Sequence, residues 1–93
     1  MDVFNDLARG AREFLNGRRL AYLRVFDKEN EHNPDIKVVM DDLAKFCRAH
    51  ESTFHPDPRT HALLEGRKEV WYRIQQHLNL SEEELWSLFN RKD

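Results

Sequence analysis

Apolar residues recur every three or four positions along most of this chain, and that spacing limits the possible folds more than any other feature. In the first stretch it places Phe4, Leu7, Ala8, Ala11, Phe14 and Leu15 on one side of a helix. The spacing returns in three later stretches, and no segment alternates apolar and polar residues as a strand would. The sequence therefore predicts an all-α fold, with four to five helices in a compact orthogonal or bundle-like array, and residues 1–93 as a single helical domain.

Glycine and proline mark the predicted breaks between helices. The first helical pattern runs from Asp2 to Asn16 and resumes after Gly17, so we interpret it as one kinked helix or two helices that meet near Gly17. Residues 27–33 are polar and have no period, which predicts a loop.

Two Xaa-Pro pairs predict the starts of the next helices. Asn33 and Asp57 are good N-caps, and the proline that follows each one would take the first helical position. The predicted buried stripe of the second helix contains Ile36, Val39, Met40, Leu43, Phe46 and Cys47. That of the third helix contains Leu63, Val70, Trp71, Ile74 and Leu78, with Leu64 and His77 flanking it.

The last predicted helix opens at Ser81. Ser81 and Glu84 have the spacing of a capping box, and the acidic residues of this first turn complement the helix dipole. Arg91 and Lys92 suit the opposite end.

Four side chains could in principle form a metal site or a nucleophilic centre. They are Cys47, His50, His55 and His61. Their spacing matches no zinc pattern, and Cys47 falls on a predicted buried stripe, where a lone cysteine usually packs as a small hydrophobe. No glycine-rich loop accompanies them. We therefore predict no metal, no cofactor and no enzymatic activity.

Gly-Arg pairs occur at Gly17-Arg18-Arg19 and at Gly66-Arg67. Glycine lets another backbone approach, and the adjacent arginine can then bond carbonyl or carboxylate groups. Three roles are open for Arg18, Arg19 and Arg67: bonding between helices, which we favour, contact with a partner protein, and nucleic-acid binding.

The two tryptophans are large for a domain of this size. Trp71 lies on the predicted stripe and is expected to fill the core, whereas Trp86 sits one step off its stripe and is the better interface candidate.

The net charge of −2 lacks the basic excess of a typical nucleic-acid module, so nucleic acid is an unlikely partner. One cysteine fits a reducing compartment, no apolar run approaches the length of a membrane span, and the first residues do not resemble a signal peptide. We expect a soluble intracellular product that does not enter a membrane.

Several short motifs resemble those of a family of small tailed-bacteriophage proteins, first named from a structural-region gene of a Bordetella podovirus. The motifs are Gly17-Arg18-Arg19, Asp42-Leu43 with Phe46-Cys47, Thr53-Phe54, and Glu65-Gly66-Arg67 leading to Val70. The resemblance covers roughly Phe14 to Leu88. It implies a gene among those for head, portal and tail, and a protein located in the virion or in the cytoplasm of the infected bacterium.

From these observations we expect a virion structural or morphogenesis protein that acts by protein–protein contact, near the portal and tail or as a minor virion protein. Its expected partners are other phage structural proteins and further copies of itself. The alternative is a small phage regulator that binds DNA or a host protein. A third possibility, a metal-dependent enzyme, depends on Cys47 and the three histidines.

Overall fold

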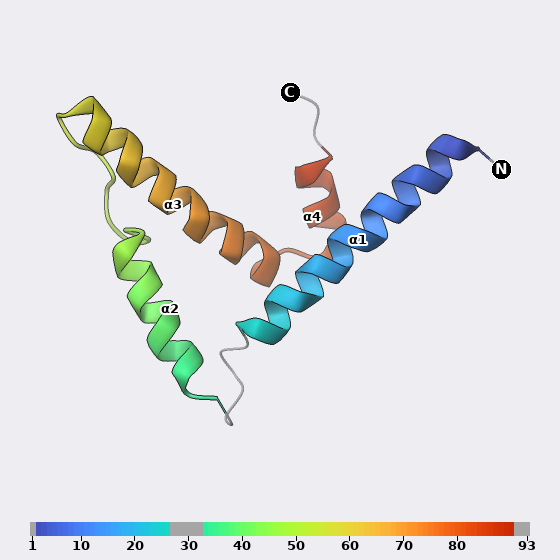
Figure 1. The fold of residues 1–93 in the computed structure, drawn as a ribbon, viewed down its shortest axis with the longest axis horizontal. Coiled ribbons are helices and arrows are strands. Elements are labelled where there is room, and N and C mark those ends of the chain that lie inside the picture. The colour runs from blue at the N-terminus through green and yellow to red at the C-terminus, as the bar shows by residue number, and fades with distance from the viewer. Residues whose placement is uncertain (1, 27–32, 91–93) are drawn as a thin grey trace.

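A computed structural model describes residues 2–26 and 33–90 of the chain. Within these ranges there are four α-helices and no strand: α1 (Val3–Val25), α2 (Asp35–Phe46), α3 (Pro58–Asn79) and α4 (Glu82–Phe89) (Figure 1). The prediction of an all-α fold with four to five helices is confirmed. Most of the predicted loop at 27–33, together with Arg91 and Lys92, lies outside the described residues.

Helix α1 is continuous from one end to the other. It begins at the N-cap Asp2, whose carboxylate accepts a hydrogen bond from the Phe4 amide at 3.0 Å, and it passes through Gly17 without ending. A Cβ added at Gly17 or at Gly66 would meet nothing within 4 Å. Of the two alternatives at Gly17, the structure has the single helix, and the division into two helices is wrong. The expected close backbone approach at both glycines is also wrong.

The starts of α3 and α4 follow their local sequence signals. The Asp57 carboxylate accepts hydrogen bonds from the amide and the hydroxyl of Thr60, at 3.1 and 2.7 Å, and these bonds lower the pKa of Asp57. Ser81 and Glu84 form the predicted capping box, with bonds of 3.1 and 3.2 Å.

The start of α2 differs from the prediction. The helix begins at Asp35, and the flanking residue is Pro34, which has no side-chain cap bond. Asn33 therefore does not cap the helix through its side chain. Its backbone carbonyl accepts a bond from the Ile36 amide at 3.4 Å.

The end of α2 is closed by a Schellman motif that has arginine where glycine is usual. The Ala49 amide bonds the Ala44 carbonyl at 2.9 Å, and the Arg48 amide bonds the Lys45 carbonyl at 3.2 Å. Arg48 has a φ of 53°, in the left-handed region that disfavours side chains with a Cβ. The turn toward α3 thus stores backbone strain at Arg48.

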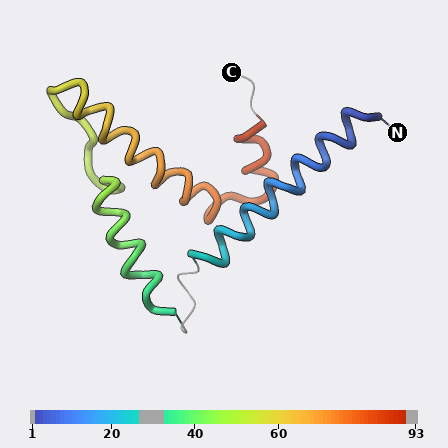
Figure 2. The backbone as a smooth tube through the Cα atoms, viewed as in Figure 1, coloured from blue at the N-terminus to red at the C-terminus, as the bar shows by residue number. Residues whose placement is uncertain are grey.

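The helices lie in a thin layer. Helix α3 packs against both α1 and α2, and α4 packs against α1, so the chain runs as angled pairs (Figure 2). The principal extents are 53 × 41 × 15 Å. The radius of gyration is 16.6 Å, compared with roughly 12 Å for a compact domain of this length. The array is therefore angular, as expected, but much flatter than a bundle.

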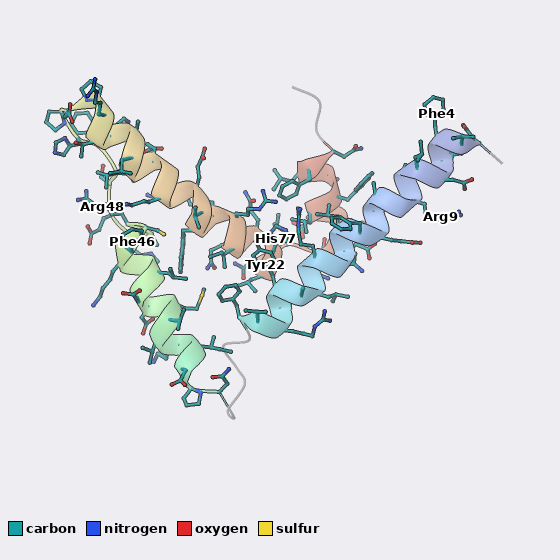
Figure 3. All side chains as sticks on the ribbon, viewed as in Figure 1. Phe4, Arg9, Tyr22, Phe46, Arg48 and His77 are labelled. Atoms are coloured by element: carbon teal, nitrogen blue, oxygen red, sulfur yellow. The ribbon has the colours of Figure 1, made fainter. Side chains whose placement is uncertain are left out.

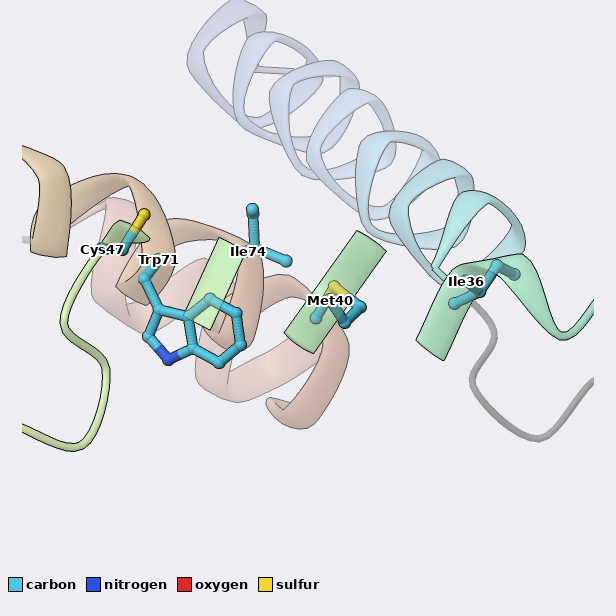
Figure 4. Packing of buried hydrophobic residues seen from close by; sticks show 5 residues of the cluster. All are labelled: Ile36, Met40, Cys47, Trp71 and Ile74. Atoms are coloured by element: carbon cyan, nitrogen blue, oxygen red, sulfur yellow. The ribbon is translucent and has the colours of Figure 1, made fainter. Parts of the chain in front are cut away.

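The main core lies between α2 and α3. It consists of Ile36, Met40, Cys47, Trp71 and Ile74, with Tyr22 and Phe26 of α1 packed at its edge (Figure 4). Several positions of the predicted stripes are instead exposed, among them Val39, Phe46, Leu63 and Val70. In α3 the buried positions are Trp71 and Ile74, which were predicted on the stripe, and Leu64 and His77, which were predicted to flank it.

Candidate interaction surface

His77 lies at the junction of three helices and is fully buried. Its ring stacks on Tyr22 of α1, with centroids 4.2 Å apart, and lies 5.6 Å from the ring of Phe89 at the end of α4. Tyr22 and His77 face each other at the centre of the molecule (Figure 3). The imidazole of His77, on α3, therefore contacts both α1 and α4.

Two hydrogen bonds fix the protonation of His77. The Nε of Arg18 donates to Nε2 at 3.0 Å, so Nδ1 carries the ring proton and donates to the Arg73 carbonyl at 2.8 Å. Burial lowers the pKa of His77, and the positive charges of Arg18 and Arg73 lower it further, against the opposing effect of the Arg73 carbonyl. The site is therefore built for a neutral ring.

The neighbouring arginines also bond within the chain. Arg19 donates from Nε to the Leu80 carbonyl at 2.9 Å, which holds the α3–α4 connection against α1. The guanidinium groups of Arg18 and Arg73 lie 5.1 and 5.2 Å from the centroid of the Phe89 ring. Arg18 and Arg19 thus contribute to the interhelical bonding that we favoured for them.

A second polar cluster fixes the elbow between α2 and α3. The hydroxyl of the buried Thr53 donates to the carboxylate of Glu65, and the Thr53 carbonyl lies 3.0 Å from Nδ1 of His61. The Arg67 guanidinium lies over the ring of Phe46, 4.3 Å from its centroid. The Glu65-Gly66-Arg67 segment therefore joins α3 to the elbow and to the end of α2.

The four predicted metal or nucleophile candidates are not assembled into a site. Cys47 is buried in the core, whereas His50 is exposed. Nδ1 of His55 accepts a bond from the Asp57 amide at 3.0 Å, and His61 is held by Thr53. Within residues 2–26 and 33–90, no group of three or more His, Cys, Asp or Glu side chains is placed to hold a metal ion.

The two tryptophans occupy different environments. Trp71 is 9% exposed and belongs to the core cluster, the position expected for it. Trp86 is half-buried on α4. Part of Trp86 is thus available to a partner.

An open apolar groove of about 400 Å³ lies between the C-terminal half of α1 and the middle of α3. Its lining is mostly apolar, with one arginine from each helix, and consists of Arg18, Ala21, Tyr22, Val25, Phe26, Val70, Arg73 and Ile74. The groove therefore adjoins the Arg18–His77 contact.

The thin layer leaves many large apolar side chains in contact with water. The accessible surface is 7424 Å², compared with roughly 5,700 Å² for a compact protein of 11.2 kDa. Phe4, Leu7 and Phe14 of α1 are 79, 66 and 73% exposed, and Phe54 at the elbow is 72% exposed. Large apolar side chains that are exposed together, as on α1, are typical of a site that a partner covers.

Sequence reasoning assigned His77 only a flanking position, although it is the centre of the three-helix junction. Its spacing of three from Ile74 and six from Trp71 was a usable signal, because these three positions lie within one face of a helix. Nothing in the local sequence indicates the partner, since Arg18 lies 59 residues away.

No described helix combines the length and the apolar character that crossing a membrane requires. Comparison with curated proteins and with solved structures gave no match. A family model described as Bbp19-like phage protein matches residues 22–90, about three quarters of the chain.

The family match includes the elbow motifs at Thr53, Glu65 and Arg67. It begins later than the resemblance suggested, so Gly17-Arg18-Arg19 lies outside it. The resemblance to a phage family named from a Bordetella phage is nevertheless confirmed. This chain belongs to the family of Bbp19-like phage proteins.

Proposed function

We propose that this protein is a structural or morphogenetic component of the phage particle and that it works by protein–protein contact, without catalysing a reaction. The observation that carries the proposal is the thin, open array of helices. Its surface exceeds that of a compact chain by roughly 1,700 Å², about twice the area that each partner contributes to a standard protein interface.

Of the side chains that could act as nucleophiles or bases, Cys47 and His77 are buried within the fold. This supports a role in protein contact and not in catalysis. Cys47 is 3% exposed, and both ring nitrogens of His77 form hydrogen bonds with protein groups. Exposed apolar residues, by contrast, lie on α1, α2, α3 and the elbow, so partners can approach from several directions.

Four of the five arginines of α1 favour this role over DNA binding. Arg9 pairs with Asp6 at 2.9 Å and Arg12 with Glu82 at 3.4 Å, while Arg18 and Arg19 bond within the chain. Cationic groups that already have intramolecular partners contribute less to phosphate binding.

The place that we propose is the virion, near the portal and tail or among the minor proteins of the particle. Mass spectrometry of purified virions, with quantification against the portal protein, tests this. We expect the protein at a fixed copy number. Its absence from both virions and assembly intermediates would overturn the proposal.

Complementation of a phage that lacks the gene gives a second test. We expect Leu63→Glu, on the exposed apolar surface of α3, to reduce the yield of infectious particles, and the matched Glu69→Gln variant to restore it fully. Gel-shift assays at low salt address the DNA alternative, and a shift at micromolar protein would favour it.

A further inference from the structure

The N-terminal half of α1 carries an apolar stripe that none of the other described helices covers. Phe4, Leu7 and Phe14 are 79, 66 and 73% exposed, and the smaller Ala11 on the same side is also exposed. Phe4 and Arg9 lie on the free end of α1, away from the other helices (Figure 3). This end of the helix therefore presents its apolar side to solvent.

The spacing of the stripe is that of a helix-pairing seam. Positions 4, 7, 11 and 14 are separated by three, four and three residues, as the core positions of a two-stranded coiled coil are. This order reads the same in both directions. A second copy of α1, running antiparallel, would present matching positions, with Phe4 opposite Phe14 and Leu7 opposite Ala11.

The centre of the stripe pairs a large residue with a small one. Leu7 would face Ala11 of the second copy, and the flanking Ala8 and Gly10 are also small. Two helices can thus approach closely at the centre, while the phenylalanines close the contact at both ends. Each copy therefore supplies both the large and the small residue that an antiparallel pairing sets opposite each other.

Surface area and helix stability favour a partner on this stripe. The stripe offers two phenylalanines and a leucine from each copy, and since a phenylalanine can bury roughly 150–250 Å², the pairing would form a contact at the small end of specific interfaces. A short helical segment that extends into water is also marginal by itself, because helices owe most of their stability to the packing of an apolar face.

We infer that two copies of this chain pair through the N-terminal halves of their α1 helices, antiparallel, about a two-fold axis near residue 9. The occupant of the stripe is thus a second copy of the same protein. The inference extends the proposed function by naming one of its contacts. The stripe precedes residues 22–90, so the contact is separate from the segment that the family model matches.

The test is the mass of the purified full chain by light scattering, at concentrations up to about 200 µM, because a contact of this size is expected to be weak. We expect at least twice the 11.2 kDa of one chain. Leu7→Glu places a charge in the seam and should at least halve the wild-type mass. Val38→Glu, at an apolar position of α2 that is 68% exposed, is the matched control and should keep it.

Circular dichroism of both variants shows whether they remain folded. A wild-type protein that stays monomeric, or a folded Leu7→Glu variant that keeps the wild-type mass, would overturn the inference. A monomer that is nevertheless found in virions would overturn the pairing and leave the proposed function standing. A dimer that is absent from virions and assembly intermediates would overturn the proposed function and leave the pairing standing.

A spin label on Arg24→Cys tests the direction of pairing. The antiparallel arrangement places the two labels about 45 Å apart along the helix axis, and a parallel one under about 20 Å. Labelling of the unsubstituted chain controls for the buried Cys47. A short label-to-label distance would overturn the antiparallel geometry.

Discussion

The Nε of Arg18 lies 3.0 Å from Nε2 of His77 and donates a hydrogen bond to it, although the two residues are 59 positions apart in the chain. Protonation of the ring would place two donors face to face and a second positive charge beside the guanidinium. The contact that joins α1 to α3 therefore requires a neutral imidazole.

This requirement predicts a loss of stability in mild acid. The pKa of His77 is lowered in the folded chain, so below about 6.5, the value for an unfolded histidine, the unfolded state binds more protons. The free energy of unfolding should fall as the pH drops from about 6.5 through the folded-state pKa. His77→Gln should flatten this dependence in urea titrations, whereas the exposed His50→Gln should not. Equal slopes for wild type and His77→Gln would contradict the prediction.

Removal of the donor should be costly in itself. Arg18→Met keeps most of the aliphatic stem but leaves Nε2 of His77 buried without its partner, and we expect a loss of about 1–3 kcal/mol in the free energy of unfolding. Arg24→Met, at an exposed position of the same helix, should change it by less than about 0.5 kcal/mol. Urea unfolding of the two variants side by side decides this, and equal losses would show that the contact is unimportant.

The elbow cluster predicts a specific role for the Thr53 hydroxyl. Thr53→Val has the same shape but removes the hydrogen bond to Glu65, and we expect it to cost about 1 kcal/mol. Thr53→Ser keeps the hydroxyl and serves as the control. If thermal unfolding shows the valine variant to be as stable as the serine variant, the hydrogen bond to Glu65 contributes nothing.

Gly66 should be replaceable with a gain in stability. It lies inside α3, where a Cβ would meet nothing within 4 Å, so Gly66→Ala should stabilise the chain by roughly 0.5–1 kcal/mol through helix propensity. The reverse change at the exposed Ala62 of the same helix, Ala62→Gly, should destabilise by a similar amount. A loss of stability in Gly66→Ala would indicate a partner or a neighbour that needs the space.

Arg48 should also be replaceable, for a different reason. Its φ of 53° strains a residue with a Cβ but does not strain glycine. Arg48→Gly should therefore raise the free energy of unfolding by about 1 kcal/mol. Arg48→Ala retains the Cβ and should show no such gain. Chemical denaturation of both variants separates relief of strain from loss of the arginine side chain, and equal stabilities would rule out strain.

The local signals of the sequence predicted local structure well. Asp57 with Pro58, and Ser81 with Glu84, specify helix starts through bonds that span only three residues, and the structure contains both. The prediction of Asn33 as the N-cap of α2 was wrong. It placed Pro34 at the first helical position, but the helix begins one residue later, at Asp35, so Pro34 takes the N-cap position.

The buried faces were less predictable. A period of 3.6 residues defines a broad apolar side, but the neighbouring helix determines which part of it is covered. In α3 the covered residues are Leu64 and His77 where the sequence pattern favoured Leu63 and Val70. The Arg18–His77 contact was not predictable at all, since it depends on how two distant helices cross.

The 15 Å thickness of the layer also has a consequence for hydrogen exchange. The Cα atoms of one helix span about 5 Å and packed helices lie about 8–10 Å apart, so the layer is at most about two helices deep. Backbone amides on both flat sides can then exchange through shallow local openings, with little need for global unfolding. If the protein enters the particle as proposed, slow exchange confined to one side there would identify the side that neighbouring molecules cover.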